Sequence, residues 1–219
     1  MSNKEYDYRD KYKSKEKADR YDTRFFSSIK GQIFTRRESK QLKEAFKSFE
    51  DKGYILDMPC GTGRITTQLL DEGFSVVGGD ISKEMLDVAI NKLEHHPNMK
   101  KFEIMDGSNI PYEDNTFDAS VCIRFMCNLP LDLQKTILKE LVRVSKETLV
   151  IGFSRDSFHY RLRNKLKRLI IGSANDYPVT DKVLDQWARD MDIQIKSKTL
   201  TIPLLSEQLI VQFEKRVAE

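Results

Sequence analysis

The sequence predicts an α/β fold: a doubly wound, mostly parallel sheet of seven strands with helices on both faces, ending in an antiparallel hairpin. Three observations predict it. Apolar runs of strand length alternate with amphipathic helical stretches between residues 54 and 154. These strands read as near-continuous apolar runs, which burial on both faces requires. Two extended runs separated by a short turn then close the chain, which is typical of a hairpin.

Local signals give the boundaries of the expected elements. A first helix is expected over residues 35–52, where Thr35 and Glu38 have the spacing of a capping box and Gly53 follows the last turn. Strands are expected over residues 54–58, 74–80, 100–106, 115–124, 147–154, 194–204 and 207–215. Helices are expected between them over residues 63–73, 82–96, 129–145 and 180–191.

Composition describes an ordinary single-domain chain. Its 219 residues are 39% hydrophobic and 32% charged, enough for one sizeable core. No apolar run approaches the roughly 20 residues that cross a bilayer, and the polar N-terminus lacks the apolar stretch of a secretory signal. We therefore expect a cytoplasmic protein. The three cysteines favour a reducing compartment over a disulfide framework, and with three histidines at unsuitable spacings no metal site is expected.

Positive charge is concentrated in two segments. Residues 1–50 and residues 155–168 each carry a formal charge of +5, whereas the whole chain carries only +3. The two segments can meet an anionic substrate, nucleic acid or a membrane surface, or they can simply be solvated helix faces. The sequence leaves these alternatives open.

A ligand site is expected where the first two strands end. In an open parallel sheet, ligands bind beyond the carboxyl ends of the strands, near the point where strand order reverses. The turn after the first strand contains Gly61 and Gly63, which permit positive φ and close approach of a ligand to the backbone. The next helix directs its free N–H groups to the same place. Asp80 ends the second strand, where an acid can accept both hydroxyl groups of a ribose.

Two details distinguish this site from a dinucleotide site. The dinucleotide fingerprint has a third glycine, but Thr66 stands at that position. Asp57 adds a negative charge beside the turn, which disfavours a pyrophosphate and favours the ammonium group of an amino acid. A nucleoside joined to an amino acid is a description of S-adenosylmethionine.

These motifs resemble those of a known family. The runs DMPCGTGR from Asp57, GGDIS with the following EML, and MDGSNIPYEDNTFD from Met105 resemble the first three motifs of the class I S-adenosylmethionine-dependent methyltransferases, which have a Rossmann-like fold. The resemblance is to the small-molecule methyltransferases of the ubiquinone/menaquinone-biosynthesis type, and it covers residues 54–153 and, in outline, the final hairpin. The chain departs from the pattern at Pro59 and at residues 145–147.

The resemblance implies a set of cofactor-binding residues. The loop of Cys60, Gly61, Thr62 and Gly63 would hold the methionine portion, with Asp57 near its ammonium group. Asp80 would take the ribose hydroxyls and Ile81 would pack against the adenine. Pro59, Arg64 and Met85 are further cofactor-binding candidates. The adenine edge would meet Asp106, Gly107 and Ser108, and the sulfonium would be flanked by Arg124, Phe125 and Met126. Tyr12 or Tyr21 would close over the cofactor.

Several of these residues have structural alternatives. Asp80 could cap the following helix, Asp106 could form an Asx turn, and Arg124 could make a surface salt bridge. Cys60 reads as a small packing residue, because no base lies near it in the sequence. His159 and Tyr160, with Arg124, are the candidates for a catalytic group if the acceptor must lose a proton, although His159 could be an exposed helix residue.

The chain is therefore expected to be one methyltransferase domain. Its parts would be an N-terminal helical lid (residues 1–52), a cofactor-binding core (53–154), a basic insertion over the acceptor (155–178) and a final helix with the hairpin (179–219). The expected reaction is methyl transfer to oxygen, nitrogen or carbon of an unidentified small molecule. Two alternatives remain: an RNA or protein methyltransferase that uses the basic segments, and a non-catalytic cofactor-binding regulatory subunit.

Overall fold

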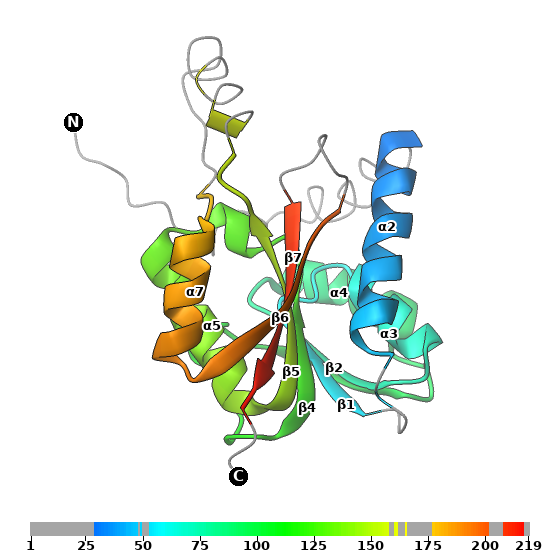
Figure 1. Cartoon of the computed structure of the whole chain (residues 1–219). Coiled ribbons are helices and arrows are strands. Elements are labelled where there is room, and N and C mark those ends of the chain that lie inside the picture. The colour runs from blue at the N-terminus through cyan, green and yellow to red at the C-terminus, as the bar shows by residue number, and fades with distance from the viewer. Residues whose placement is uncertain are drawn as a thin grey trace, which may run out of the picture.

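One seven-stranded sheet organises the molecule (Figure 1). The structure is a computed structural model, and it describes residues 29–47, 49, 53–157, 160–161, 165, 177–201 and 208–216. The strand order is β3-β2-β1-β4-β5-β7-β6. The doubly wound fold that the sequence predicts is confirmed.

The strands and helices lie close to their expected positions. The strands are β1 (Tyr54–Asp57), β2 (Ser75–Asp80), β3 (Met99–Ile104), β4 (Phe117–Cys122), β5 (Ser145–Ser154), β6 (Ile193–Leu200) and β7 (Gln208–Lys215). The α-helices are α2 (Ile29–Ala45), α3 (Arg64–Asp71), α4 (Lys83–Leu93), α5 (Leu131–Val144) and α7 (Asp181–Asp190). A short 3₁₀ turn, η2 (Met126–Asn128), follows β4 and was not expected from the sequence.

The central strand β1 marks the point where the sheet reverses its order. It pairs in parallel with β2 on one side and with β4 on the other. The chain moves outward from β1 through β2 to β3, and then returns to build the other half from β4. At the far edge β7 pairs antiparallel with both β5 and β6, which confirms the expected hairpin.

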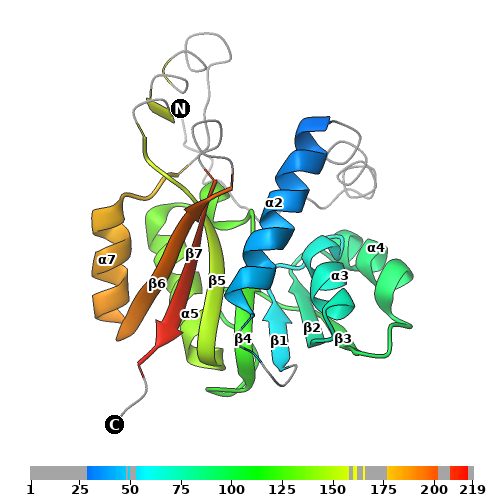
Figure 2. The same ribbon diagram turned by 45° about the vertical axis from the view of Figure 1, so that its right-hand side comes forward.

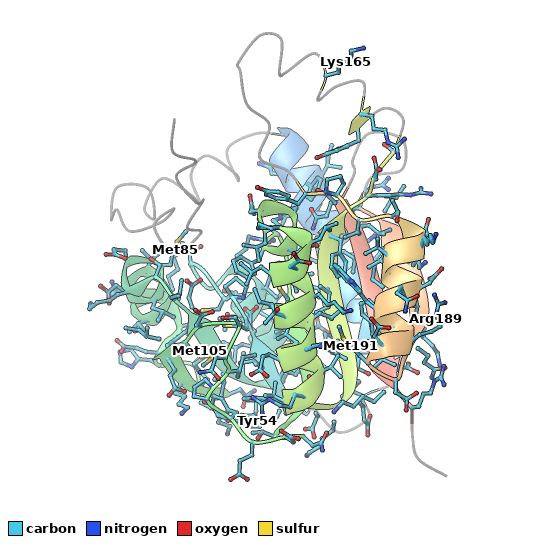
Figure 3. The ribbon with its side chains drawn as sticks, turned by 90° about the vertical axis from the view of Figure 1, so that its left-hand side faces the viewer. Tyr54, Met85, Met105, Lys165, Arg189 and Met191 are labelled. Atoms are coloured by element: carbon cyan, nitrogen blue, oxygen red, sulfur yellow. The ribbon has the colours of Figure 1, made fainter. Side chains whose placement is uncertain are left out.

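Each face of the sheet packs against its own helices. Side chains alternate along a strand, so Ile55 belongs to one hydrophobic cluster and its neighbour Leu56 to the other. The Leu56 cluster is covered by α5 and α7, which face the viewer in Figure 3. The Ile55 cluster is covered by α2 and α3, which lie side by side in Figure 2. The apolar character of the strands thus follows from burial on both sides.

Helix α2 differs from its prediction at both ends. It already runs at Ile29 and ends at Ala45, whereas the sequence predicted residues 35–52. Thr35 does not cap it: its hydroxyl donates to the carbonyl of Gly31, one turn earlier, which is a bond inside the helix. Gly53 begins the approach to β1 and does not end the helix. Leu42, Ala45 and Phe46 near its C-terminal end are buried, so this side of the helix packs on the core.

Two of the other helices begin at a side-chain cap. Ser82 caps α4 by accepting a hydrogen bond from Met85 N, and Thr180 caps α7 by accepting one from Val183 N. Among the described residues, no helix is both long and apolar enough to cross a membrane.

Candidate functional site

A pocket opens at the carboxyl ends of β1, β2 and β4, beside the reversal of strand order. Figure 3 shows Met85 near this edge, while Tyr54, the first residue of β1, lies at the opposite edge of the sheet. Eleven expected site residues line the pocket: Pro59, Cys60, Gly61, Thr62, Arg64, Asp80, Ile81, Met85, Gly107, Arg124 and Phe125. Five further residues line it that the sequence did not single out: Met58, Ile65, Ser82, Ile123 and Asn128.

Two glycines shape the turn between β1 and α3 in different ways. Gly61 has φ +56°, and a Cβ atom built there would meet nothing within 4 Å, so this side of the turn faces open space. Gly63 has φ +80°, and a Cβ atom there would lie 2.7 Å from Leu93 Cδ1. Gly63 therefore lets α3 pack against α4, whereas Gly61 leaves the backbone open towards the pocket.

Asp80 connects the end of β2 to this turn. Its Oδ2 accepts a hydrogen bond from Gly61 N at 2.9 Å, and its Oδ1 accepts one from Ser82 N at 2.8 Å. Ser82, and not Asp80, is the cap of α4. Burial raises the pKa of Asp80 to about 6, although the backbone donors oppose this effect. Each oxygen keeps acceptor capacity that can meet a ligand hydroxyl from the pocket.

Asp57 lies behind the turn and does not line the pocket. Its side chain is buried, and its Oδ2 accepts a hydrogen bond from the Thr66 hydroxyl at 2.6 Å. Its Oδ1 has no hydrogen-bond partner. Burial raises the pKa of Asp57 to about 7, against the lowering effects of Thr66 and Arg64.

The turn after β3 shows the local hydrogen bonds of an Asx turn. Asp106 Oδ1 accepts from Ser108 N at 2.9 Å and from the Ser108 hydroxyl at 2.7 Å. Gly107 lines the pocket, whereas Asp106 and Ser108 stand beside it. The adenine contact of these two residues stays a prediction.

The segment after β4 forms the opposite wall. Arg124 has φ +63°, which is uncommon outside glycine and costs roughly 1 kcal/mol. Asn128 stabilises the turn by donating to the carbonyls of Arg124 and Phe125 at 3.2 and 3.3 Å. Met126 is fully buried in the core, so only its backbone could approach a ligand.

A buried acid on α2 holds the two arginines of the pocket. Glu38 is fully buried; its carboxylate contacts Arg64 Nη1 and accepts from Arg124 Nε at 3.0 Å. Gln208 Nε2 donates to the same carboxylate at 2.9 Å. Burial alone would raise the pKa of Glu38, but the guanidinium groups of Arg64 and Arg124 outweigh it and lower the pKa. Arg124 also lies over the Phe34 ring, 4.6 Å from its centroid.

This ion cluster corrects two sequence-based interpretations. Arg124 does form a salt bridge, but a buried one, because its side chain is only 11% exposed. Glu38 was read as half of a capping box, and its spacing from Thr35 gave no signal of a long-range role. The partners of Glu38 lie 26, 86 and 170 residues away in the chain, so no local pattern connects them.

The structure describes only some of the remaining expected site residues. Tyr12, Tyr21 and His159 lie outside the described residues. Tyr160 is described and is 4% exposed, and its backbone N donates to the Ser157 hydroxyl at 3.1 Å. Cys60 is buried, and burial raises its pKa well above the usual value, which fits a packing role. Within the described residues, no three His, Cys, Asp or Glu side chains come together as metal ligands.

Comparisons with known sequences point to one enzyme family. A family model described as a methyltransferase domain matches residues 55–148. The demethylmenaquinone methyltransferase of Geobacillus sp. (strain WCH70) is 31% identical over 204 residues, covering 78% of this chain and 85% of that protein. The 18S rRNA (guanine-N(7))-methyltransferase of Bos taurus is 41% identical over 83 residues, which cover 36% of this chain and 28% of that protein. Several curated relatives are matched over only 30% to 49% of their own length.

A solved structure shares the fold over almost the whole chain. The magnesium protoporphyrin IX methyltransferase of Synechocystis PCC 6803, solved with bound SAM, superposes with a TM-score of 0.73 and 16% identity. The match covers 98% of this chain and 100% of that one. At this identity the likeness concerns the fold alone.

The two glycines of the turn should differ in their effect on stability. Gly63→Ala should lower the free energy of unfolding by about 2–4 kcal/mol, because it adds both an unfavourable φ and a steric clash with Leu93. Gly61→Ala should cost about 1 kcal/mol, since only φ is unfavourable there. Urea unfolding of the two variants measures both values, and equal losses would contradict the packing role of Gly63.

Asp57 should make the protein less stable as pH rises. Its pKa of about 7 in the folded state exceeds its value in an unfolded chain, so between about pH 4 and pH 7 the folded state binds more protons. The free energy of unfolding therefore falls with rising pH in this window. Asp57→Asn removes this titration. The free energy of unfolding of the variant, relative to that of the wild type, should therefore be higher at pH 7.5 than at pH 4.5 by on the order of 1–4 kcal/mol. Thermal melts at both pH values check this, and parallel pH profiles for both proteins would rule it out.

Proposed function

Because the chain belongs to the class I S-adenosylmethionine-dependent methyltransferases, its cofactor is S-adenosylmethionine, and we propose that it transfers the cofactor's methyl group to a small-molecule acceptor. One observation carries the proposal. Asp80 is fixed by Gly61 N and Ser82 N beside an open glycine turn, so a ribose acceptor and a backbone cradle lie together. A nucleoside with a short polar tail fits this combination.

The same residues argue against a dinucleotide. Thr66, at the position of the third glycine, is fully buried and bonded to Asp57. A pyrophosphate would need room at this point, and it would approach the Asp57 carboxylate. The tail of S-adenosylmethionine needs neither a third glycine nor a site for two phosphates.

The proposed contacts follow the cofactor from its base to its sulfur. Asp80 would accept the ribose hydroxyls, Ile81 and Met85 would pack on adenine, and Gly107 would line its edge with Asp106 and Ser108. The turn from Pro59 to Gly63 would hold the methionine portion. Asp57 would act on its ammonium group through its charge, from behind this turn, since its side chain does not line the pocket. The backbone of Arg124, Phe125 and Met126 would flank the sulfonium.

Methyl transfer from a sulfonium is an in-line displacement with a good leaving group. The bound cofactor supplies the activated methyl group. The chain's part is to align the acceptor and to exclude water. The apolar residues Ile123 and Phe125 beside Arg124 support this role, because they line the pocket where β4 ends. His159 or Tyr160 would accept a proton only for an acceptor that must lose one.

The parts outside the core would cover the pocket. In this proposal residues 1–52 act as a lid that closes through Tyr12 or Tyr21, and residues 155–178 cover the acceptor and offer their basic side chains to an anionic substrate or a membrane surface. The proposal includes a cytoplasmic location, which the three free cysteines support. The demethylmenaquinone methyltransferase of Geobacillus, matched over most of its length, favours a small acceptor by its name.

A second candidate function is methylation of RNA. The similarity to the 18S rRNA (guanine-N(7))-methyltransferase of Bos taurus favours it, together with the basic segment 155–168. RNA binding through that segment would weaken steeply as salt concentration rises. A non-catalytic regulatory subunit would bind cofactor without any turnover.

Cofactor binding should depend on Asp80. Calorimetry should detect binding of S-adenosylmethionine and of its demethylated product, S-adenosylhomocysteine, but not of NADH. Asp80→Ala should weaken product binding by about 1–3 kcal/mol, because the ribose hydroxyls lose their acceptor. Asp87→Ala on the exposed side of α4 is the matched control and should bind normally. Unchanged affinity in Asp80→Ala would remove this residue from the site.

Turnover should identify the acceptor class. Incubation of the protein with methyl-labelled S-adenosylmethionine and a fractionated lysate should transfer label to the small-molecule fraction. Label in the RNA fraction would favour the second candidate, and cofactor binding without label in any fraction would favour the regulatory subunit.

A further inference from the structure

Three large apolar side chains are exposed among the described residues, and they share one edge of the molecule. Ile104, Ile33 and Leu131 are 59%, 46% and 38% exposed. Ile104 ends β3 and pairs with Asp80, which lines the pocket. Leu131 begins α5, after the turn that contributes Asn128 to the pocket wall. A single exposed apolar residue is ordinary on a protein surface, but three at the edge where a pocket opens indicate a contact surface.

Ile33 reaches this edge because of the direction in which α2 runs. Gln208 at the start of β7 donates to Glu38, and Gln212, further along β7, donates to the carbonyl of Ala45. Since β7 begins at the pocket edge, α2 runs from that edge along the strand. Ile33 precedes Glu38 by more than one helical turn, so it lies beyond the strand ends. Figure 1 and Figure 2 show the first turns of α2 rising past the strands.

The exposed side of these turns is basic. Arg36, Arg37 and Lys40 are exposed and make no hydrogen bond or ion pair with a described residue. They follow Ile33 at the spacing that places side chains on one side of a helix. Glu38, the acid in this stretch, is fully buried on the other side of α2. We call Ile33, Arg36, Arg37 and Lys40 the α2 stripe.

The charge on the α2 stripe favours an anionic partner. The stripe contains cations and no acid, so the electrostatic potential over it is positive. Lys165 is also exposed, and Figure 3 shows it on the same side of the molecule, away from Tyr54. Asp132 beside Leu131 adds a negative charge at the start of α5. The attraction for an anion is therefore centred on α2.

The exposed isoleucine distinguishes a membrane from a nucleic acid. The phosphate groups of RNA need only cations and hydrogen-bond donors. In a helix that lies on a membrane, the apolar side chains enter the boundary of the hydrocarbon, whereas Lys and Arg side chains stay with the headgroups. Ile33 among three cations has this arrangement, and Ile104 and Leu131 add apolar side chains at the same edge. A lipid surface thus fits better than RNA.

We propose that the pocket edge of the protein contacts an anionic lipid bilayer through the α2 stripe, with its three cations on the headgroups and Ile33 in the surface. The pocket then opens towards the bilayer. The stripe is separate from residues 155–178 and contains no residue that lines the pocket. The proposal therefore goes beyond the proposed function and does not depend on methyl transfer.

The test is sedimentation of the full chain with lipid vesicles. The protein should pellet with phosphatidylcholine vesicles that contain about 30% phosphatidylglycerol, and far less with phosphatidylcholine alone, because anionic headgroups attract the stripe. Raising NaCl from about 0.05 M to about 0.5 M should weaken the binding, since salt screens these charges. The double variant Arg36→Gln/Arg37→Gln should lower the partition coefficient at least about tenfold, and Ile33→Ser about threefold or more.

A matched control removes the same charge elsewhere. Lys100 lies near Tyr54 at the opposite edge of the sheet, and Lys139 lies on α5; both are exposed. Lys100→Gln/Lys139→Gln should therefore bind anionic vesicles within about twofold of the wild type. A melting temperature for each variant confirms that folded protein is compared.

The outcomes separate the membrane surface from the function. Failure of the wild type to bind anionic vesicles overturns the proposal, and so does an equal loss of binding in the two double variants. Binding to a labelled single-stranded RNA without binding to vesicles assigns the stripe to nucleic acid instead. Calorimetry with S-adenosylhomocysteine tests the proposed function separately, and Arg36→Gln/Arg37→Gln should bind this ligand as the wild type does, because the stripe does not line the pocket.

Discussion

The parallel pairing of β1 with both β2 and β4 is the constraint on which the rest of the structure depends. The chain leaves β1 in one direction and later returns on its other side, so the helices that follow β1 and β4 lie on opposite faces of the sheet. Their connections separate at the carboxyl ends of these strands, and the gap between them is the pocket.

The two ends of the pocket use different physical interactions. At β2 the backbone N–H groups of Gly61 and Ser82 hold one carboxylate, which links the first turn to the second strand at little conformational cost. At the end of β4, Arg124 is held in an ion cluster whose other members come from α2, α3 and β7. Buried ion pairs contribute little net stability, since desolvation offsets their attraction. Their effect is to orient side chains, which is what a binding site requires.

The sequence predicts this fold well because its signals are local. The apolar runs and the glycine turn each depend on neighbouring residues, and the structure has them where they are expected. Asp80 was identifiable for the same reason, since it ends a strand at a fixed distance from Gly61. Glu38 was not, because its partners are distant in sequence and its spacing from Thr35 fits a cap. Asp57 was expected near the ligand, but no pattern in the sequence reveals that its side chain lies behind the turn.

The antiparallel strand β7 has a consequence for which part of the chain meets the pocket. A parallel strand in its place would begin at the opposite edge of the sheet, so its first residue would lie far from the pocket. Because β7 runs antiparallel to β6, Leu200 at the end of β6 and Gln208 at the start of β7 both lie at the same edge of the sheet as the glycine turn. Gln41 of α2 donates to Leu200 O at 3.1 Å there, next to the Glu38 cluster. The hydrogen bonds of Gln208 to Glu38 and of Gln41 to Leu200 thus tie the terminal strands to the wall of the pocket that Arg124 forms.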